Sequence, residues 1–279
     1  MHAREDSSAD DGLGSLQIHL DARPLRHPTT RSIIRLPLSK RSLAWALAVE
    51  WDSLASAAQA TKEHLIPLTS LVCRALDIAE DDAVKRPEEA RIRTNIAKMV
   101  LRYLDTDSML CWAPPAGKYD RVNAAGESLR EMQKRIADDV VSYLTTHVWP
   151  GITIIPVLDG DSISPRRQGP GVREVIQGWI SGLGSWEIAG LERAVLASKS
   201  CIAAARLIAE WSDASLAPQT SANESTFGVD DAAKATNLET DWQTQQWGEV
   251  EDTHDVNKED LKRQLGGAIL LVSGDSRKL

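Results

Sequence analysis

The chain has 279 residues, of which 42% are hydrophobic and 26% are charged. This balance is typical of a globular protein with one large core or two modest ones, and it excludes an intrinsically disordered chain. The formal net charge of −8 argues against a general binder of nucleic acid or anionic membranes, because phosphate binding relies on clustered Lys and Arg. No apolar run approaches the roughly 20 residues of a membrane-spanning helix, so no membrane span is expected.

The three cysteines, Cys73, Cys111 and Cys201, are widely spaced. An odd, dispersed set predicts neither a metal or redox pair nor a disulfide framework. The chain also has nine Trp and a single Phe. This usage slightly favours contact surfaces over a uniformly dry core, because amphipathic rings suit partly wet positions.

The first part of the chain predicts a tail followed by a small sheet. Residues 1–14 are polar and are predicted to form a disordered tail. Residues 17–20 alternate between apolar and polar types, residues 31–36 are rich in strand-forming types, and prolines punctuate the stretch between them. This pattern is typical of a short hairpin or small sheet.

After the sheet, the apolar period changes to that of a helix. Leu43, Leu47, Trp51, Leu54 and Ala58 recur at three- and four-residue steps and therefore share one helix face. We expect Trp51 to be a core residue, because a large ring on an apolar stripe usually packs inward. Its neighbours Glu50 and Asp52 lie off the stripe and are expected in solvent.

The remaining elements are predicted to be mainly helical. Pro67 and Pro87 stand where helices could begin, and the proline-rich residues 113–117 mark a domain boundary. We therefore predict an α+β fold with an N-terminal α+β domain at residues 15–118 and a mainly helical C-terminal domain at residues 119–279. The C-terminal helices are expected at residues 129–144, 172–180, 186–197, 201–211, 232–242 and 261–272, with one strand at residues 152–158.

The sequence contains no phosphate-binding loop, dinucleotide fingerprint, nucleophile elbow or zinc-protease motif. We therefore expect a protein that is not an enzyme and that uses no cofactor. One alternative is a hydrolase that uses Asp161 and Ser162, although the surrounding loop supplies Arg166 and Arg167 instead of a histidine base. Another is a non-catalytic helical scaffold. His254 lies among carboxylates, but a lone histidine in an acidic loop is usually solvated, so no metal is expected.

Charge is segregated along the chain. Residues 23–41 carry six basic residues, Arg31 and Arg35 among them, and no acidic one, whereas residues 230–260 are strongly acidic. The two segments could attract each other or could each be a solvated surface. Alternatively, they form a two-signed docking face that steers one protein partner.

The most distinctive stretch is residues 242–255, where Trp242 and Trp247 run into the carboxylates Glu249, Glu251 and Asp252. Tryptophan is costly to leave in water and dense carboxylates repel one another, so the combination suggests a recognition surface. The alternative is a core-facing Trp242, a glycine that ends the helix, and a solvated acidic linker.

Five segments carry a family resemblance: residues 20–25, 48–52, 67–71, 103–112 and 242–255. In order and spacing they resemble the ATP synthase mitochondrial F₁ complex assembly factor 2 family, the chaperones of the ATP synthase α subunit, in its fungal type. Together they cover nearly the whole chain from about Leu16 onward.

The resemblance implies a chaperone that binds the unassembled α subunit of the F₁ sector until it pairs with the β subunit, without ATP hydrolysis. It implies a mitochondrial matrix protein, expected to be monomeric. The acidic N-terminus differs from an Arg-rich presequence, so no targeting segment is visible. The implied functional acid maps to Glu249 or Glu251, and we favour Glu251. The expected partner-binding residues are Glu249, Glu251, Asp252, Trp247, Arg31 and Arg35, and the expected structural core includes Trp51 and Trp242.

Overall fold

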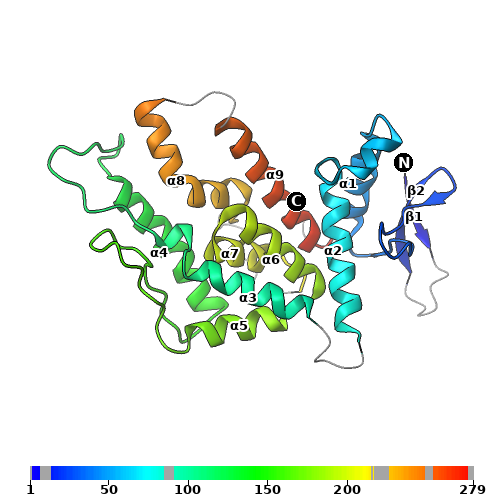
Figure 1. Cartoon of the computed structure of the whole chain (residues 1–279), viewed down its shortest axis with the longest axis horizontal. Helices are drawn as coiled ribbons and strands as arrows, with labels where there is room; N and C mark the ends of the chain where they lie inside the picture. Colours follow the sequence, from blue (N-terminus) through cyan, green and yellow to red (C-terminus); the bar gives the residue numbers. More distant parts are fainter. Residues whose placement is uncertain are drawn as a thin grey trace.

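The computed structural model describes residues 2–6, 14–84, 91–214, 216, 226–248 and 254–275. A small sheet lies at one end of an elongated molecule, and the helices occupy the rest (Figure 1). Helix α2 (Pro67–Asp82) stands between the sheet and most of the other helices (Figure 1). The predicted α+β fold is therefore confirmed.

Strand β2 (Ser15–Leu20) is the centre of the sheet and buries Leu16 and Ile18. It pairs antiparallel with β1 (His2–Asp6), β3 (Arg23–Pro24) and β4 (Leu36–Pro37).

Strand β1 lies within residues 1–14, for which a disordered tail was predicted. The described residues 2–6 are instead paired in the sheet, so for them the prediction was wrong. Two ion pairs neutralise the acids of this strand: Arg35 Nη1 lies 2.7 Å from Asp6, and Arg41 Nη2 lies 2.7 Å from Glu5. Their basic partners are distant in sequence, so local polarity alone did not indicate a strand.

Helix α1 (Arg41–Asp52) follows the first part of the predicted apolar stripe and buries Leu43 and Leu47. It ends before Leu54 and Ala58, so for these two residues the predicted helix was wrong. Two 3₁₀ turns, η1 (Ala57–Thr61) and η2 (Glu63–Leu65), lead to α2. The latter begins at Pro67 as predicted, because proline needs no helical N–H at that position. Helix α3 (Ile92–Leu104) comes next, and Pro87 lies outside the described residues.

The expected C-terminal helices are all present: α4 (Leu129–His147), α5 (Val172–Gly182), α6 (Ser185–Ser198), α7 (Cys201–Trp211), α8 (Val229–Trp247) and α9 (His254–Val272). The predicted strand at residues 152–158 was wrong. This segment makes only an isolated bridge between Leu158 and Cys111. Pro156 lacks an N–H to donate, which prevents a regular ladder.

The helices of the two predicted domains pack on one another. Helix α6 contacts α9 and α2, and one hydrophobic core runs through both parts. A Cβ atom on Gly190 in α6 would lie 2.6 Å from Val272 Cγ1, so this glycine permits the close approach of α6 and α9. The domain division after residue 118 stays a prediction.

The start of α1 and the end of α9 are joined through Lys40. Its ammonium group is buried and donates to the carbonyls of Leu271 (2.9 Å) and Ser273 (3.2 Å) at the end of α9. Burial lowers the pKa of Lys40, while nearby carboxylates oppose that shift. In return, Asp275 Oδ1 accepts a 2.9 Å hydrogen bond from the Arg41 amide at the start of α1. Each helix end thus satisfies orphan groups of the other.

Asp107 joins the middle of the chain to α7. Its fully buried carboxylate accepts hydrogen bonds from the backbone amides of Met109 and Ile202, each at 3.0 Å, and from Ser200 Oγ at 2.6 Å. It therefore holds η3 (Ser108–Leu110) against the first turn of α7. Desolvation raises the pKa of Asp107 to about 6, and the hydrogen bonds oppose that shift.

Candidate functional site

A groove with exposed aromatic walls lies at the C-terminal end of α8. Its volume is about 370 Å³, and Trp242, Trp247, Tyr119 and the pair Pro114 and Pro115 line it. Trp247 is 78% exposed and Tyr119 is 89% exposed. Both rings could be covered by a partner, because large exposed apolar rings gathered at one place are typical of contact surfaces.

The loop that forms one wall of this groove is fixed to the helices. Arg121 Nη1 donates to the Gln246 side chain at 2.5 Å, and Arg130 Nη1 donates to the Ala113 carbonyl at 2.9 Å. A Cβ atom on Gly160 would lie 2.5 Å from Pro114 Cα, and Gly160 has φ +78°. Only glycine therefore permits the backbone contact that supports the proline wall.

Trp242, expected in the core, and Trp247, expected to bind a partner, differ in their surroundings. Trp242 is half-buried and faces the groove. Helix α8 ends at Gly248, which has φ +88°, directly after Trp247. Glu249, Glu251 and Asp252 follow, and they lie outside the described residues.

The acidic and basic segments do not pair with each other through the salt bridges of the described residues. On the acidic side, Lys258 Nζ lies 3.0 Å from Asp241 and Lys262 Nζ lies 2.8 Å from Asp230, so α8 and α9 neutralise each other. On the basic side, Arg35 binds Asp6, as described above. Each segment thus has ion-pair partners of its own, which the sequence interpretation did not anticipate.

Trp51 and Glu50 connect two segments that carry the family resemblance, residues 48–52 and 67–71. Trp51 is half-buried against the core, and its Nε1 donates to Thr69 Oγ1 at 2.7 Å. The Glu50 carboxylate accepts from the amides of Leu68 (2.6 Å) and Thr69 (2.9 Å), and from the Thr69 hydroxyl at 2.6 Å.

The expectation that Glu50 lies free in solvent was therefore wrong. Its carboxylate caps the first turn of α2 from a neighbouring helix. The residue before Pro67 is Ile66, whose side chain makes no capping hydrogen bond. A helix start without a local cap is the sequence signal that could have indicated an acceptor elsewhere.

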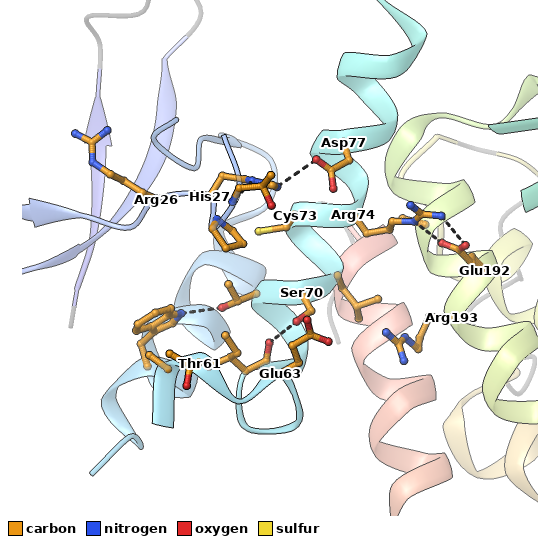
Figure 2. Close-up of a pocket in the computed structure, with 18 of the residues that line it drawn as sticks. Arg26, His27, Thr61, Glu63, Ser70, Cys73, Arg74, Asp77, Glu192 and Arg193 are labelled. Atoms are coloured by element: carbon orange, nitrogen blue, oxygen red, sulfur yellow. Dashed lines mark hydrogen bonds and ion pairs between the residues drawn. The ribbon is translucent and has the colours of Figure 1, made fainter. Parts of the chain in front are cut away.

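A hollow of about 740 Å³ lies beside the network of Trp51 and Glu50 and is shown in Figure 2. Its walls come from residues 26–31, from α2 and from α6. Arg74 makes two hydrogen bonds to Glu192, at 2.7 and 2.8 Å, and His27 Nε2 lies 3.3 Å from Asp77 Oδ1. Arg31 lines this hollow, whereas Arg35 does not.

The contacts of Asp161 and Ser162, the residues of the hydrolase alternative, do not form a catalytic arrangement. Ser162 is exposed, and its Oγ accepts a 3.0 Å hydrogen bond from the Ser164 amide. The Asp161 amide donates to Asp159, whose carboxylate pairs with Arg166 at 2.5 Å. These contacts close a loop and supply no base to the Ser162 hydroxyl.

The described residues contain no group of three or more potential metal ligands. Among the helices that the structure describes, none combines the length and the apolar character needed to cross a bilayer.

The fold is also found in solved structures. Atp12 from Paracoccus denitrificans superimposes with a TM-score of 0.65 at 18% identity, covering 97% of this chain and 94% of that one. A chaperone-type protein from Agrobacterium tumefaciens superimposes with a TM-score of 0.63 at 18% identity, covering 97% and 82%. These likenesses show a shared fold.

Sequence relatives define the family. The profile of the family described as ATP12 chaperone protein matches residues 2–145. Mitochondrial atp12 of Schizosaccharomyces pombe is 31% identical over 268 residues, covering 92% of this chain and 77% of the relative. Mitochondrial ATP12 of Saccharomyces cerevisiae is 32% identical over 269 residues, covering 92% and 78%.

The chain therefore belongs to the ATP12 chaperone family. It is a mitochondrial chaperone of ATP synthase assembly, which confirms the resemblance identified from the five sequence segments.

Proposed function

We propose that this protein binds the unassembled α subunit of the F₁ sector and keeps it soluble until the β subunit displaces it, as a monomer and without catalysis. The observation that carries the proposal is the pair of exposed rings, Trp247 and Tyr119, in a groove that directly precedes the acidic stretch. Apolar rings would cover a sticky client surface, and the carboxylates would restrict binding to clients with basic groups nearby.

The client contact is proposed to comprise Trp247, Glu249, Glu251 and Asp252, with Trp242 as a half-buried wall. Displacement by the β subunit would supply the energy of release, so no nucleotide is required. Arg31 and Arg35 would add steering charge. The contribution of Arg35 would be the smaller, because Asp6 already shares its charge.

Replacing Trp247 with alanine is expected to weaken the capture of isolated α subunit by about tenfold or more, because buried aromatic anchors commonly contribute 2 kcal/mol or more. The melting temperature should barely change, because the ring is 78% exposed. The matched control is Trp45→Ala, which removes a 59% exposed ring from α1. Equal loss of capture in both variants would contradict a specific role for the α8 groove.

Charge reversal at Glu251 tests the acidic part of the contact. Glu251→Lys turns an attraction into a repulsion and is expected to cost several kcal/mol of binding. The free energy of unfolding of this variant, measured by thermal melting, should change by no more than about 0.5 kcal/mol. The measurements are α-subunit solubility and melting of the same preparation. Loss of both would make Glu251 a structural residue, and loss of neither would make the acidic run a solvated surface.

A further inference from the structure

The hollow of Figure 2 continues past the first turns of α2. A neighbouring hollow of about 820 Å³ lies between α2 and α9. We call the hollow of Figure 2 the first hollow and this one the second hollow. Both hollows are lined by Glu63, Ser70, Leu71 and Arg193. We call the two together the α2 groove. It is therefore a long depression that could hold a segment of chain rather than a single side chain.

The lining of the α2 groove is partly apolar along its length. Trp51 and Leu196 contribute to the first hollow, Pro67 and Leu270 contribute to the second, and Leu71 contributes to both. Apolar lining in an open groove gains free energy when a partner covers it.

The cations of the first hollow fall into two groups. Arg74 is held by Glu192, as described above. In contrast, the ion pairs of the described residues include no carboxylate within 4.0 Å of the guanidinium of Arg26, Arg31 or Arg193. Arg193 makes a 3.4 Å hydrogen bond to the Gln264 side chain, and it adds to the effect of Arg263 in lowering the pKa of Asp260 in the neighbouring hollow. Figure 2 shows Arg193 on the α6 side of the hollow, opposite the segment that carries His27.

The anions of the same hollow are mostly matched. Glu192 binds Arg74, and Asp77 faces His27. Glu63 is exposed and is the remaining carboxylate in the lining. After these internal pairs, three arginines of the lining, Arg26, Arg31 and Arg193, remain against one glutamate, so the first hollow can accept a carboxylate from outside.

Arg31 is held in a defined place. It has φ +64°, a left-handed conformation that is uncommon for a residue with a side chain. Its amide donates to the His27 carbonyl at 3.0 Å, and its own carbonyl accepts from Arg26 Nη1 at 2.8 Å. The loop therefore fixes the backbone and leaves the Arg31 side chain available.

We propose that the α2 groove is a second docking site, which takes a segment of the client protein that carries a carboxylate among apolar side chains. The client's identity as the α subunit rests on the proposed function above, whereas the groove's preference rests on its own lining. A nucleic acid is the poorer occupant, because Glu63 and Asp77 would repel its phosphates and the chain is acidic as a whole.

The first test reverses the charges of Arg31 and Arg193. In the variant Arg31→Glu with Arg193→Glu, association with isolated α subunit at low ionic strength is expected to slow by about tenfold or more, and added salt should shrink the difference. The matched control is Arg102→Glu, an exposed reversal on α3 outside the groove. An association rate equal to that of the control would overturn the proposal. If the wild-type protein does not hold the α subunit, the proposed function fails instead.

The second test keeps the charge and the fold. Arg193→Lys places an amine in the groove that a carbodiimide can join to a client carboxylate, and Arg102→Lys is the control. Mass spectrometry of the complex is expected to find residue 193 linked to an Asp or Glu of the α subunit that has apolar neighbours. A link only to a second copy of this chain, or no link beyond the control, would overturn the proposal.

Discussion

Replacing Trp51 with alanine is expected to lower the free energy of unfolding by about 3 kcal/mol. The indole packs against the core and donates to Thr69 Oγ1 at 2.7 Å, so the change removes both apolar contacts and a hydrogen bond. The expected value lies at the low end for an aromatic truncation because the ring is only half-buried. Chemical denaturation with fluorescence or circular dichroism measures it.

Two comparisons make this prediction specific to the Trp51 network. Trp51→Phe keeps most of the packing and should lose only about 1 kcal/mol, the value of one hydrogen bond. Trp45→Ala, on the exposed face of the same helix, should change stability by about 0.5 kcal/mol or less. A stably folded Trp51→Ala protein that fails to hold its client would instead make Trp51 a contact residue.

Replacing Asp107 with alanine is expected to cost about 3 kcal/mol or more at pH 7. The carboxylate accepts three hydrogen bonds in a fully buried site, and hydrogen bonds to a charged group contribute about 1.5–3 kcal/mol each. The pKa of Asp107, raised from 3.8 to about 6, is the net result of desolvation and of these opposing hydrogen bonds, so it is not a separate cost to set against them. Removing the carboxylate leaves two buried backbone amides and the Ser200 hydroxyl without their acceptor, so the variant should be less stable.

The same residue gives a pH dependence with a definite sign. Because its folded-state pKa is raised, the folded protein binds the proton more tightly than the unfolded chain between pH 3.8 and about 6. The stabilisation from this proton is complete below the unfolded-state pKa and is lost as the pH rises through about 6. Unfolding curves at several pH values should show this component in the wild type and not in Asp107→Ala. An identical pH dependence in both would contradict the assignment.

Periodicity and proline placement predicted the helices well, because both act within one turn of chain. The stripe through Leu43 and Leu47 and the start of α2 at Pro67 are such cases. Strand β1 and the bent segment around Pro156 were missed, because their states depend on partners far away in sequence. β1 needs β2 and two distant arginines. Residues 152–158 instead bond to the backbone near Cys111 and to the Gln168 side chain.

The candidate site was predictable in its residue types and not in its pairings. The exposure of Trp247 fits the proximity of aromatic and acidic residues in the sequence. The roles of Glu50 and Asp107 could not be read in the same way, since each caps a helix that begins many residues later. Likewise, only the fold distinguishes Arg35, which binds Asp6, from Arg31, which lines the α2 groove.

The most direct test of the proposed function is the selectivity of the wild-type protein for isolated F₁ subunits. Light scattering would follow the aggregation of α subunit and, separately, of β subunit, each with an equimolar amount of this protein. We predict that the protein suppresses aggregation of the α subunit alone, and that adding β subunit afterwards releases it from the complex. Equal protection of both subunits, or protection of neither, would contradict a chaperone dedicated to the α subunit.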